Sequence, residues 1–304
     1  MPVLTRLIPS PVVVDIRPGA LADLATVLAD ERISHSGRLA VAVSGGSGAK
    51  LRERVAPQLP GATWYEVDGG TLDDAVRLAD DIRAGHFDAL VGLGGGKIID
   101  CAKYAAARVG LPLVAVPTNL AHDGLCSPVA TWELANRVNG EKIDGLAAAM
   151  ARQAGEAVLR HPGGIEDNDF LQVLAEALVL SGIAMSVSGD SRPSSGACHE
   201  INHAFDLLFP QRAASHGEQC GLGAAFAMYL RGAHEASAHM AGVLRRHGLP
   251  VRAEDIGFTV DEFVRVVEFA PETRPGRYTI LEHLDLKTDQ IKDIYADYVK
   301  AIGS

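Results

Sequence analysis

A strand that runs into three glycines and then directly into a helix restricts the fold of this chain more than any other feature. Residues 89–93 are apolar and predict a buried strand, and Gly94, Gly95 and Gly96 precede a helix expected to begin near Lys97. A second apolar strand, LPLVAVPT, follows that helix. Strands joined in this order lie parallel, and their ligands bind at the carboxyl ends of the strands. Bare backbone at the helix N-terminus predicts a pyrophosphate site there.

Strands and helices also alternate in the residues before this motif. Residues 11–16, PVVVDI, predict a first strand, and RLAVAVSGGSG predicts a strand that enters another glycine-rich turn. That turn does not match a P-loop, because Lys50 is followed by Leu51 instead of serine or threonine and the glycine spacing differs. TWYEVDGGT then predicts a strand and a turn before an amphipathic helix. This alternation is typical of an α/β domain.

Three histidines lie in residues 191–223. His199 and His203 are four residues apart and share one face of a helix, and His216 opens a long apolar helix after a short loop. Two helices joined in this way can bring His199 and His216 together, and two imidazoles with a carboxylate make a metal site with an open position. A histidine pair at this spacing is more often a surface or capping feature, so both interpretations stay open. Arg192 lies just upstream of the first of these helices and is a candidate cation for binding an anionic group of the substrate.

Composition excludes several classes of partner. The chain has 304 residues, of which 47% are hydrophobic and 22% charged, as in one large or two ordinary globular domains. The net charge of −10 argues against nucleic acid as the main partner, because phosphate binding relies on basic surface. The sequence contains no apolar run of about 18 residues, so no transmembrane helix is expected. The N-terminus lacks the apolar core of a signal peptide. The four cysteines form no CxxC motif and are interpreted as reduced thiols of a cytoplasmic protein.

The residues from 132 to 304 predict a helical domain, after an α/β domain over 1–131. NDFLQVLAEALVLSGIAMSVSG predicts a strongly apolar helix buried among others. The tail predicts two or three helices with a loop at PETRPGRYT.

Four motifs together resemble one enzyme family. They are GGGKIIDCAK (94–103), PTNLAHDGLCSP (117–128), SRPSSGACHEINH (191–203) and HGEQCGLG (216–223). With these motifs the chain resembles the glycerol-1-phosphate dehydrogenase branch of the iron-containing alcohol dehydrogenase superfamily, a relative of glycerol dehydrogenase and, more distantly, of dehydroquinate synthase. The resemblance implies an N-terminal dinucleotide-binding α/β domain, a C-terminal all-α domain, and a site in the cleft between them.

The resemblance also implies a role for individual residues. Those expected to hold the cofactor are Gly94, Gly95, Gly96 and Lys97 at the pyrophosphate, and Thr118 and Ser127 along the nicotinamide. Asp123 and His203 would contact the substrate and relay a proton, and His199 and His216 would be metal ligands. The implied cofactors are NAD or NADP and one divalent metal, zinc as first choice with iron or nickel as alternatives. The implied partner is a small phosphorylated polyol or ketone, and a homo-oligomer is compatible with the family.

The chain departs from this family at the third metal ligand, which the family supplies as an aspartate. SPVAT (127–131) runs directly into WELANRVNGEKIDG, so roughly 50 residues around that aspartate are expected to be absent. Glu133, Glu141, Asp144, Asp190 and Glu200 are carboxylates near the motifs, but none matches the family's pattern. Two alternatives to a dehydrogenase therefore stay open: a non-catalytic nucleotide-binding relative that lost its metal, and a lyase similar to dehydroquinate synthase.

Overall fold

Two compact units make up the molecule. The computed structural model describes residues 11–45, 47–118 and 138–303. Within the described residues, one unit spans residues 12–118 and the other spans residues 138–303. The boundary predicted between residues 131 and 132 lies outside the described residues.

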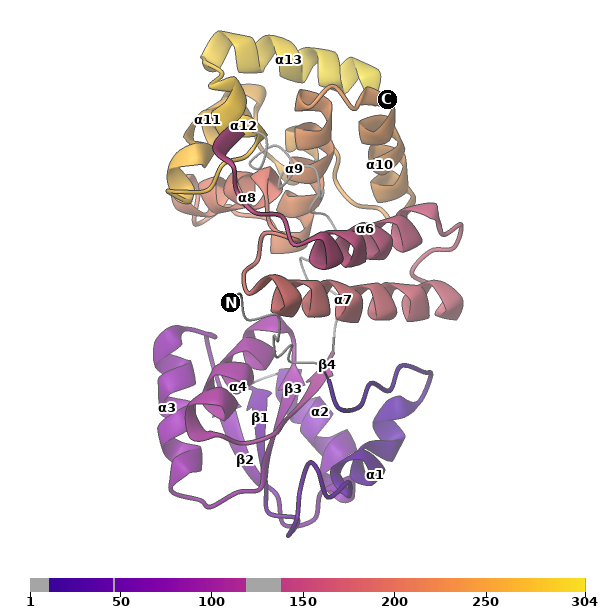
Figure 1. Ribbon diagram of the computed structural model, residues 1–304, viewed down its shortest axis with the longest axis vertical. Helices are drawn as coiled ribbons and strands as arrows, with labels where there is room; N and C mark the ends of the chain where they lie inside the picture. Colours follow the sequence, from indigo (N-terminus) through magenta and orange to yellow (C-terminus); the bar gives the residue numbers. More distant parts are fainter. Residues whose placement is uncertain (1–10, 46, 119–137, 304) are drawn as a thin grey trace, which may run out of the picture. The chain divides into compact units, whose positions relative to one another are not determined.

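A parallel sheet forms the centre of the first unit (Figure 1). Its strands are β1 (Leu39–Ser44), β2 (Thr63–Val67), β3 (Ala89–Gly94) and β4 (Leu113–Pro117). They lie in the order β2-β1-β3-β4, and every neighbouring pair is parallel. All six residues of β3 are buried, which explains its continuous apolar sequence.

Helices cover both faces of this sheet. They are α1 (Leu24–Leu28), α2 (Ser47–Val55), α3 (Leu72–Arg83) and α4 (Gly96–Val109), with short 3₁₀ segments at Ala20–Asp23 and Ala56–Gln58. The side chains of α3 and α4 pack with Ala40, Ala42 and Leu90 on one face. Those of α1 pack with Val41 and Val91 on the other. Residues alternate between the faces because successive side chains of a strand point in opposite directions.

The prediction of a strand at residues 11–16 is wrong. The segment has no regular secondary structure, and Val12, Val13 and Val14 are 59%, 41% and 50% exposed. Runs of β-branched residues favour a strand only where a neighbouring strand supplies hydrogen bonds and side-chain contacts. The described part of the sheet offers this segment no such pairing.

The second unit is helical over its described residues, as predicted. Its helices are α6 (Gly145–Arg160), α7 (Asn168–Ser188), α8 (Ala197–Leu208), α9 (His216–Leu230), α10 (His234–Arg246), α11 (Val260–Phe269), α12 (Ile280–Leu284) and α13 (Thr288–Ala301), with 3₁₀ segments at Ala253–Ile256 and Ala270–Thr273. Side-chain caps mark several starts: Thr259 and Thr279 each form a capping box with a glutamate three residues later.

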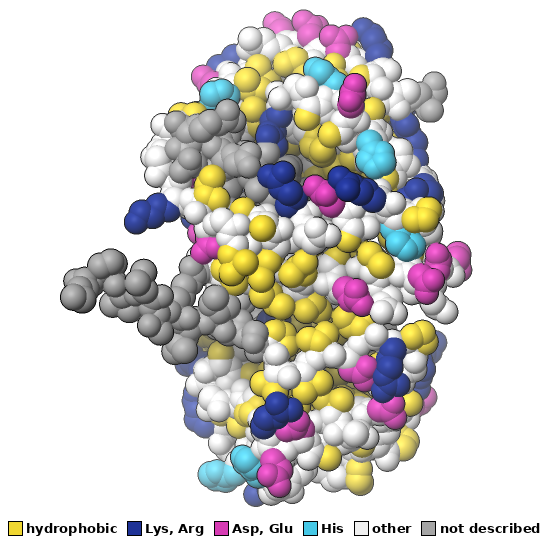
Figure 2. Space-filling model, turned by 45° about the vertical axis from the view of Figure 1, so that its right-hand side comes forward, with side chains coloured by type: hydrophobic (Ala, Val, Ile, Leu, Met, Phe, Trp, Pro, Cys, Tyr) yellow, Lys and Arg dark blue, Asp and Glu magenta, His cyan; other side chains and the backbone are white. Residues whose placement is uncertain are grey.

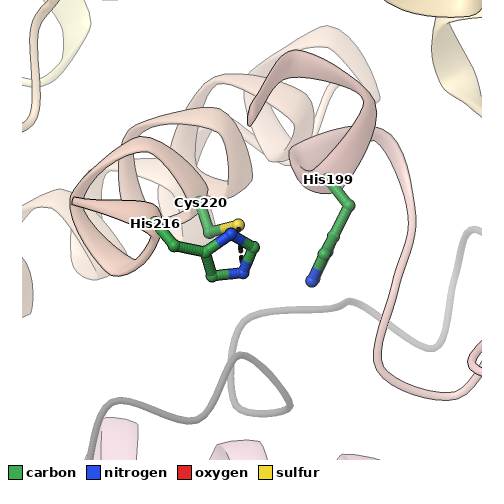
Figure 3. A group of neighbouring side chains, drawn as sticks. All are labelled: His199, His216 and Cys220. Atoms are coloured by element: carbon green, nitrogen blue, oxygen red, sulfur yellow. Dashed lines mark hydrogen bonds between the residues drawn. The ribbon is translucent and has the colours of Figure 1, made fainter. Parts of the chain in front are cut away.

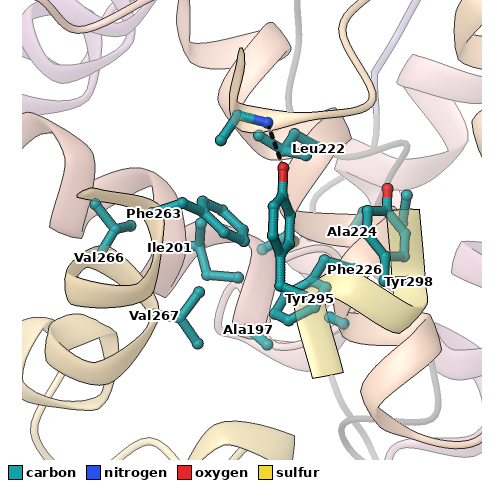
Figure 4. Close-up of a cluster of buried hydrophobic side chains, with 14 of the residues drawn as sticks. Ala197, Ile201, Leu222, Ala224, Phe226, Phe263, Val266, Val267, Tyr295 and Tyr298 are labelled. Atoms are coloured by element: carbon teal, nitrogen blue, oxygen red, sulfur yellow. Dashed lines mark hydrogen bonds between the residues drawn. The ribbon is translucent and has the colours of Figure 1, made fainter. Parts of the chain in front are cut away.

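Aromatic side chains form the centre of the main core of this unit (Figure 4). The ring of Phe226 on α9 lies 5.3 Å from Phe263 on α11 and 5.4 Å from Tyr298 on α13, measured between centroids. Tyr295 on α13 accepts a hydrogen bond from Ala253 N at its hydroxyl (2.8 Å). This core holds α8 and α9 against the C-terminal helices, and it thereby positions the first residues of both.

Helix α7 is less buried than its sequence predicts. It is the one helix in the described ranges that is long and apolar enough to cross a membrane by length and composition, and 28% of its most apolar window is buried. Its buried side chains include Phe170, Ala177 and Ala184. The expectation that it lies buried among other helices is therefore correct for one face only. The expectation of no membrane insertion stays a prediction.

Charged side chains of both signs are interspersed over the face drawn in Figure 2. This mixture accompanies the net charge of −10. The prediction that nucleic acid is not the main partner rests on that charge balance.

Candidate functional site

The glycine turn between β3 and α4 has the predicted form. Gly94 ends the strand, Gly95 is the N-cap in an extended conformation, and the helix begins at Gly96. A Cβ at Gly94 would lie 2.8 Å from the Cβ of Ile98, so the helix could not pack this closely over a larger residue. A Cβ at Gly96 would meet nothing within 4 Å. The turn thus leaves open space beside the first N–H groups of α4, which have no partner within a helix.

The strand order places this turn at a switch point of the sheet. The chain leaves β1 for β2 on one side, while β3 lies on the other side of β1. Ligands of open parallel sheets bind outside the carboxyl ends of strands at such a point. Gly45 follows β1 there, and Gly94 ends β3. Thr118 joins the same edge, because its N–H donates to the carbonyl oxygen of Gly94 at 3.0 Å.

Of the residues predicted to hold the cofactor or substrate, two lie outside the described residues: Asp123 and Ser127. The glycines, Lys97 and Thr118 lie together at the carboxyl edge of β3 and β4. Lys97 is exposed on the first turn of α4, where a cation can reach a phosphate bound at the turn.

The two histidines predicted as metal ligands do meet. His199 lies on the first turn of α8, His216 is the first residue of α9, and their ring centroids are 5.4 Å apart (Figure 3). A capping box at the start of α9 orients its first turn: Ser215 N–H and hydroxyl both donate to Glu218, at 3.0 and 2.6 Å. The packing of α8 on α9 is close because a Cβ at Gly223 would lie 3.1 Å from the backbone of Cys198.

A third potential ligand, Cys220, was missed by the sequence analysis, which interpreted the four cysteines as reduced thiols. Its Sγ lies 3.5 Å from Nε2 of His216, one turn earlier on α9. The ligand atoms of His199, His216 and Cys220 all lie within 4.8 Å of one another. The spacing of His216 and Cys220 was the available signal, because residues four apart share a helix face. Cys198 has a different place: its Sγ contacts Nδ1 of His199 at 3.2 Å.

The described carboxylates considered as substitutes for the family's aspartate have other roles. Asp190 and Glu141 both form ion pairs with Arg192, at 2.6 and 2.8 Å. Asp144 caps α6 by accepting from two backbone N–H groups. Glu200 is fully buried and accepts a hydrogen bond from Thr279 at 2.8 Å. Burial, together with Glu282 nearby, raises the pKa of Glu200 to about 8. Glu133 lies outside the described residues.

His203 lies one turn after His199 on α8, beside a group of cations that the sequence analysis did not find. Burial, with the charge of Arg274 next, lowers the pKa of His203. Arg274 and Arg277 both donate to the hydroxyl of Ser191, at 3.4 and 3.0 Å. Arg274 also donates to the hydroxyl of Ser195. No local pattern predicts this group, because about 80 residues separate its arginines from its serines.

The chain is similar in sequence to proteins of one family. The family model described as iron-containing alcohol dehydrogenase matches residues 15–149. A glycerol-1-phosphate dehydrogenase [NAD(P)+] from Hyperthermus butylicus is 32% identical over 270 aligned positions, which include 72% of this chain and 76% of the relative. One from Saccharolobus islandicus is 31% identical over 286 positions, with 76% and 81% covered.

Solved structures share the fold of the chain. A probable glycerol dehydrogenase from Sinorhizobium meliloti has a TM-score of 0.70 at 18% identity and covers 92% of this chain and 94% of its own. A sulfoacetaldehyde reductase from Bifidobacterium kashiwanohense, solved in complex with NAD+, has a TM-score of 0.63 at 15% identity and covers 99% and 100%. These similarities confirm the predicted fold class.

The alignment lengths also bear on the predicted missing segment. Because 72% of 304 residues is about 219, roughly 50 of the 270 aligned positions face no residue of this chain. That length matches the segment expected to be absent after SPVAT. With about a third of its aligned residues identical to glycerol-1-phosphate dehydrogenases over three quarters of their length, the chain belongs to the iron-containing alcohol dehydrogenase family, in the group of the glycerol-1-phosphate dehydrogenases.

Proposed function

We propose that this chain is a metal-dependent, NAD(P)-linked oxidoreductase that reduces dihydroxyacetone phosphate to sn-glycerol 1-phosphate. The observation that carries the proposal is the meeting of His199 and His216, in a chain 32% identical to a glycerol-1-phosphate dehydrogenase. A divalent ion held by these histidines would polarise the ketone oxygen, and the nicotinamide would supply the hydride. Zinc is the proposed ion, with iron or nickel as alternatives.

For the remaining residues we propose the roles that the family resemblance implies. Gly94, Gly95 and Gly96 would bind the cofactor pyrophosphate at the N-terminus of α4, with Lys97 as the cation. Thr118 and Ser127 would line the nicotinamide side of the cofactor. Asp123 and His203 would contact the substrate, and one of them would exchange the proton at its oxygen.

Arg274 and Arg277 are the proposed site for the substrate phosphate. Their guanidinium groups share the Ser191 hydroxyl, and Nη1 of Arg277 is buried with no hydrogen-bond partner in the part of the chain that the structure describes. Burial and the charges of Arg274 and Arg192 lower the pKa of Arg277, which is the mark of a cation that lacks a full counter-charge. A phosphate would supply that charge and accept paired hydrogen bonds.

Arg192 itself is a weaker candidate for phosphate binding than its sequence position suggests. Asp190 and Glu141 already pair with it at 2.6 and 2.8 Å. A cation with two carboxylate partners gains less from a further anion, so the structure favours Arg274 and Arg277 over the predicted Arg192.

The test is turnover by the full chain after it is loaded with zinc. NADH and NADPH oxidation would be followed on addition of dihydroxyacetone phosphate, with bound metal measured on the same sample. His216→Ala is expected to lower kcat/KM by about 100- to 1,000-fold, because loss of the ion removes several kcal/mol of charge stabilisation. His239→Ala is the matched control, since this histidine of α10 is exposed and contacts the carbonyl oxygen of Leu159 at 3.3 Å.

Two other outcomes separate the remaining hypotheses. Binding of nicotinamide cofactor without turnover by the zinc-loaded chain would indicate the non-catalytic relative. Turnover without net consumption of NAD(P)H would indicate a lyase similar to dehydroquinate synthase. The sequence comparisons favour neither, because the relatives named above are dehydrogenases.

We also propose a domain boundary near residue 131, a cytoplasmic location and a homo-oligomeric state. A phosphorylated three-carbon ketone is the proposed small-molecule partner.

A further inference from the structure

The site at the start of α8 and α9 contains a sulfur atom among its potential ligands. His216 and Cys220 lie on one face of α9, with Nε2 and Sγ 3.5 Å apart, and His199 of α8 faces both (Figure 3). His199 and Cys220 are buried, while His216 is more exposed. The ligand atoms of the three residues therefore face one common point. The buried residues His199 and Cys220 flank this point, and the more exposed His216 lies on its solvent side.

The separation of His216 and Cys220 in the structure fits a shared metal ion. Zinc binds histidine nitrogen at about 2.0–2.1 Å and cysteine sulfur at about 2.3 Å, so tetrahedral geometry places such atoms about 3.6 Å apart. The observed 3.5 Å already matches that value. The three ligand atoms lie within 4.8 Å of one another, so binding would draw the widest pair together by at most about 1.5 Å.

Cys198 supports the same arrangement without belonging to it. Its Sγ contacts Nδ1 of His199 at 3.2 Å, which leaves Nε2 of that ring to face the ion. Metal-binding histidines commonly use one ring nitrogen for the ion and the other for a fixing contact. The two cysteines thus have separate positions: Cys198 contacts His199, and Cys220 lies beside His216.

We infer that the thiolate of Cys220 is the third protein ligand of the metal, in the position that the family fills with an aspartate. The inference rests on the proposed metal-dependent function. A thiolate carries the same single negative charge as a carboxylate and leaves the fourth position of the ion open for substrate. It also restricts the choice of ion, because thiolates select zinc and similar soft ions over magnesium or manganese. Glu200 and Glu218, the acidic residues nearest in sequence, are turned to Thr279 and Ser215 instead.

The test is cobalt binding to the full chain after its native metal has been removed with a chelator. Cobalt(II) bound by a thiolate gives a charge-transfer band in the near ultraviolet, which nitrogen and oxygen ligands do not give. We expect one cobalt per chain with this band in the parent. Cys220→Ser should lose the band and bind cobalt at least 10- to 100-fold more weakly, the loss known for groups that only support a ligand.

Two further variants keep the result interpretable. Cys198→Ser should retain the band, because that sulfur contacts His199 without reaching the ion. Cys220→Asp should bind cobalt without the band, because a carboxylate then takes the position. Circular dichroism and thermal unfolding of the metal-free proteins would establish that each variant folds.

Three outcomes would overturn the inference: no cobalt or no band in the parent, an unchanged affinity in Cys220→Ser, or loss of the band only in Cys198→Ser. These outcomes are distinct from failure of the proposed function. A parent that shows the band but does not turn over dihydroxyacetone phosphate keeps Cys220 as a ligand and refutes the reductase. A parent that reduces dihydroxyacetone phosphate with bound metal but shows no band keeps the reductase and refutes Cys220 as a ligand.

Discussion

The β3–α4 turn and the α8–α9 pair prepare binding sites from opposite kinds of atoms. The turn offers backbone N–H groups beside Gly96, and its glycines leave the space next to these groups free of side chains. The helix pair offers the rings of His199 and His216 and the sulfur of Cys220, which meet only because two helices pack closely. A backbone site is therefore determined within a few consecutive residues, whereas a side-chain site depends on the whole helical core.

Removing a central core ring should break the side-chain site and spare the backbone site. Phe226→Ala is expected to lower the free energy of unfolding of the helical unit by about 3–5 kcal/mol, because the ring packs against Phe263 and Tyr298 in a buried cluster. Hydrogen exchange resolved along the chain would measure the effect for each unit. Protection should fall in α8, α9 and α13 and stay unchanged in β1 and β3. An equal loss in both units would contradict this separation.

Removing a charge from the group of Arg274 and Arg277 should sharpen the contrast between the two kinds of site. These cations, like the metal ligands, are brought together by folding alone. Arg277→Gln is expected to raise the KM for dihydroxyacetone phosphate by about 10- to 100-fold, since hydrogen bonds to charged groups contribute about 1.5–3 kcal/mol. The readout is the ratio of kcat/KM for dihydroxyacetone phosphate to that for dihydroxyacetone, which has no phosphate. Arg192→Gln should change this ratio little, because Asp190 and Glu141 already pair with that arginine. A larger change in Arg192→Gln would move the phosphate site to it.

Two glycine substitutions in one turn should separate folding from binding. Gly94→Ala places a Cβ 2.8 Å from Ile98 and is expected to destabilise the α/β unit by about 1–3 kcal/mol. Gly96→Ala meets nothing within 4 Å and should leave stability unchanged or slightly higher, because alanine favours a helix. It should nevertheless weaken NADH binding by roughly tenfold, about 1.4 kcal/mol, by filling the space beside the N–H groups. Thermal unfolding and cofactor titration measure the two effects, and unaltered NADH affinity in Gly96→Ala would place the pyrophosphate elsewhere.

A half-buried histidine outside the site should add a small acid sensitivity to the helical unit. His247 stacks on Phe170 with centroids 4.7 Å apart, and neither ring nitrogen has a hydrogen-bond partner among the described residues. Burial, with Arg246 next, lowers the pKa of His247. Its contribution to stability is therefore present above the unfolded pKa of about 6.5 and is lost as pH falls through the lower folded value.

His247→Phe keeps the stacking on Phe170 and cannot take up a proton. Its melting temperature should exceed that of the parent by a few degrees at most below pH 6, and the excess should shrink towards pH 8. Thermal unfolding at both pH values measures this difference. An excess that does not depend on pH would show that the ring of His247 does not titrate on unfolding in this range.

The sequence alone determined the elements whose signals are local. The apolar run of β3, the glycines after it and the helix beginning at Gly96 were all predictable, because backbone conformation there depends on neighbouring residues. The pairing of His199 with His216 was predictable from helix spacing and a short loop. Residues 11–16 show the limit of such signals, since the valines favour a strand but have no described neighbour to pair with.

Only the tertiary structure decided which side chains share a site across long separations. Cys220 lies at helical spacing from His216, yet whether its sulfur faces His199 depends on how α8 packs on α9. Arg277 reaches Ser191 across 86 residues, and Glu200 turns away from the histidines towards Thr279 across 79. The physical reason is that packing of the helical core sets which face of each helix points inward, and no window of consecutive residues contains that information.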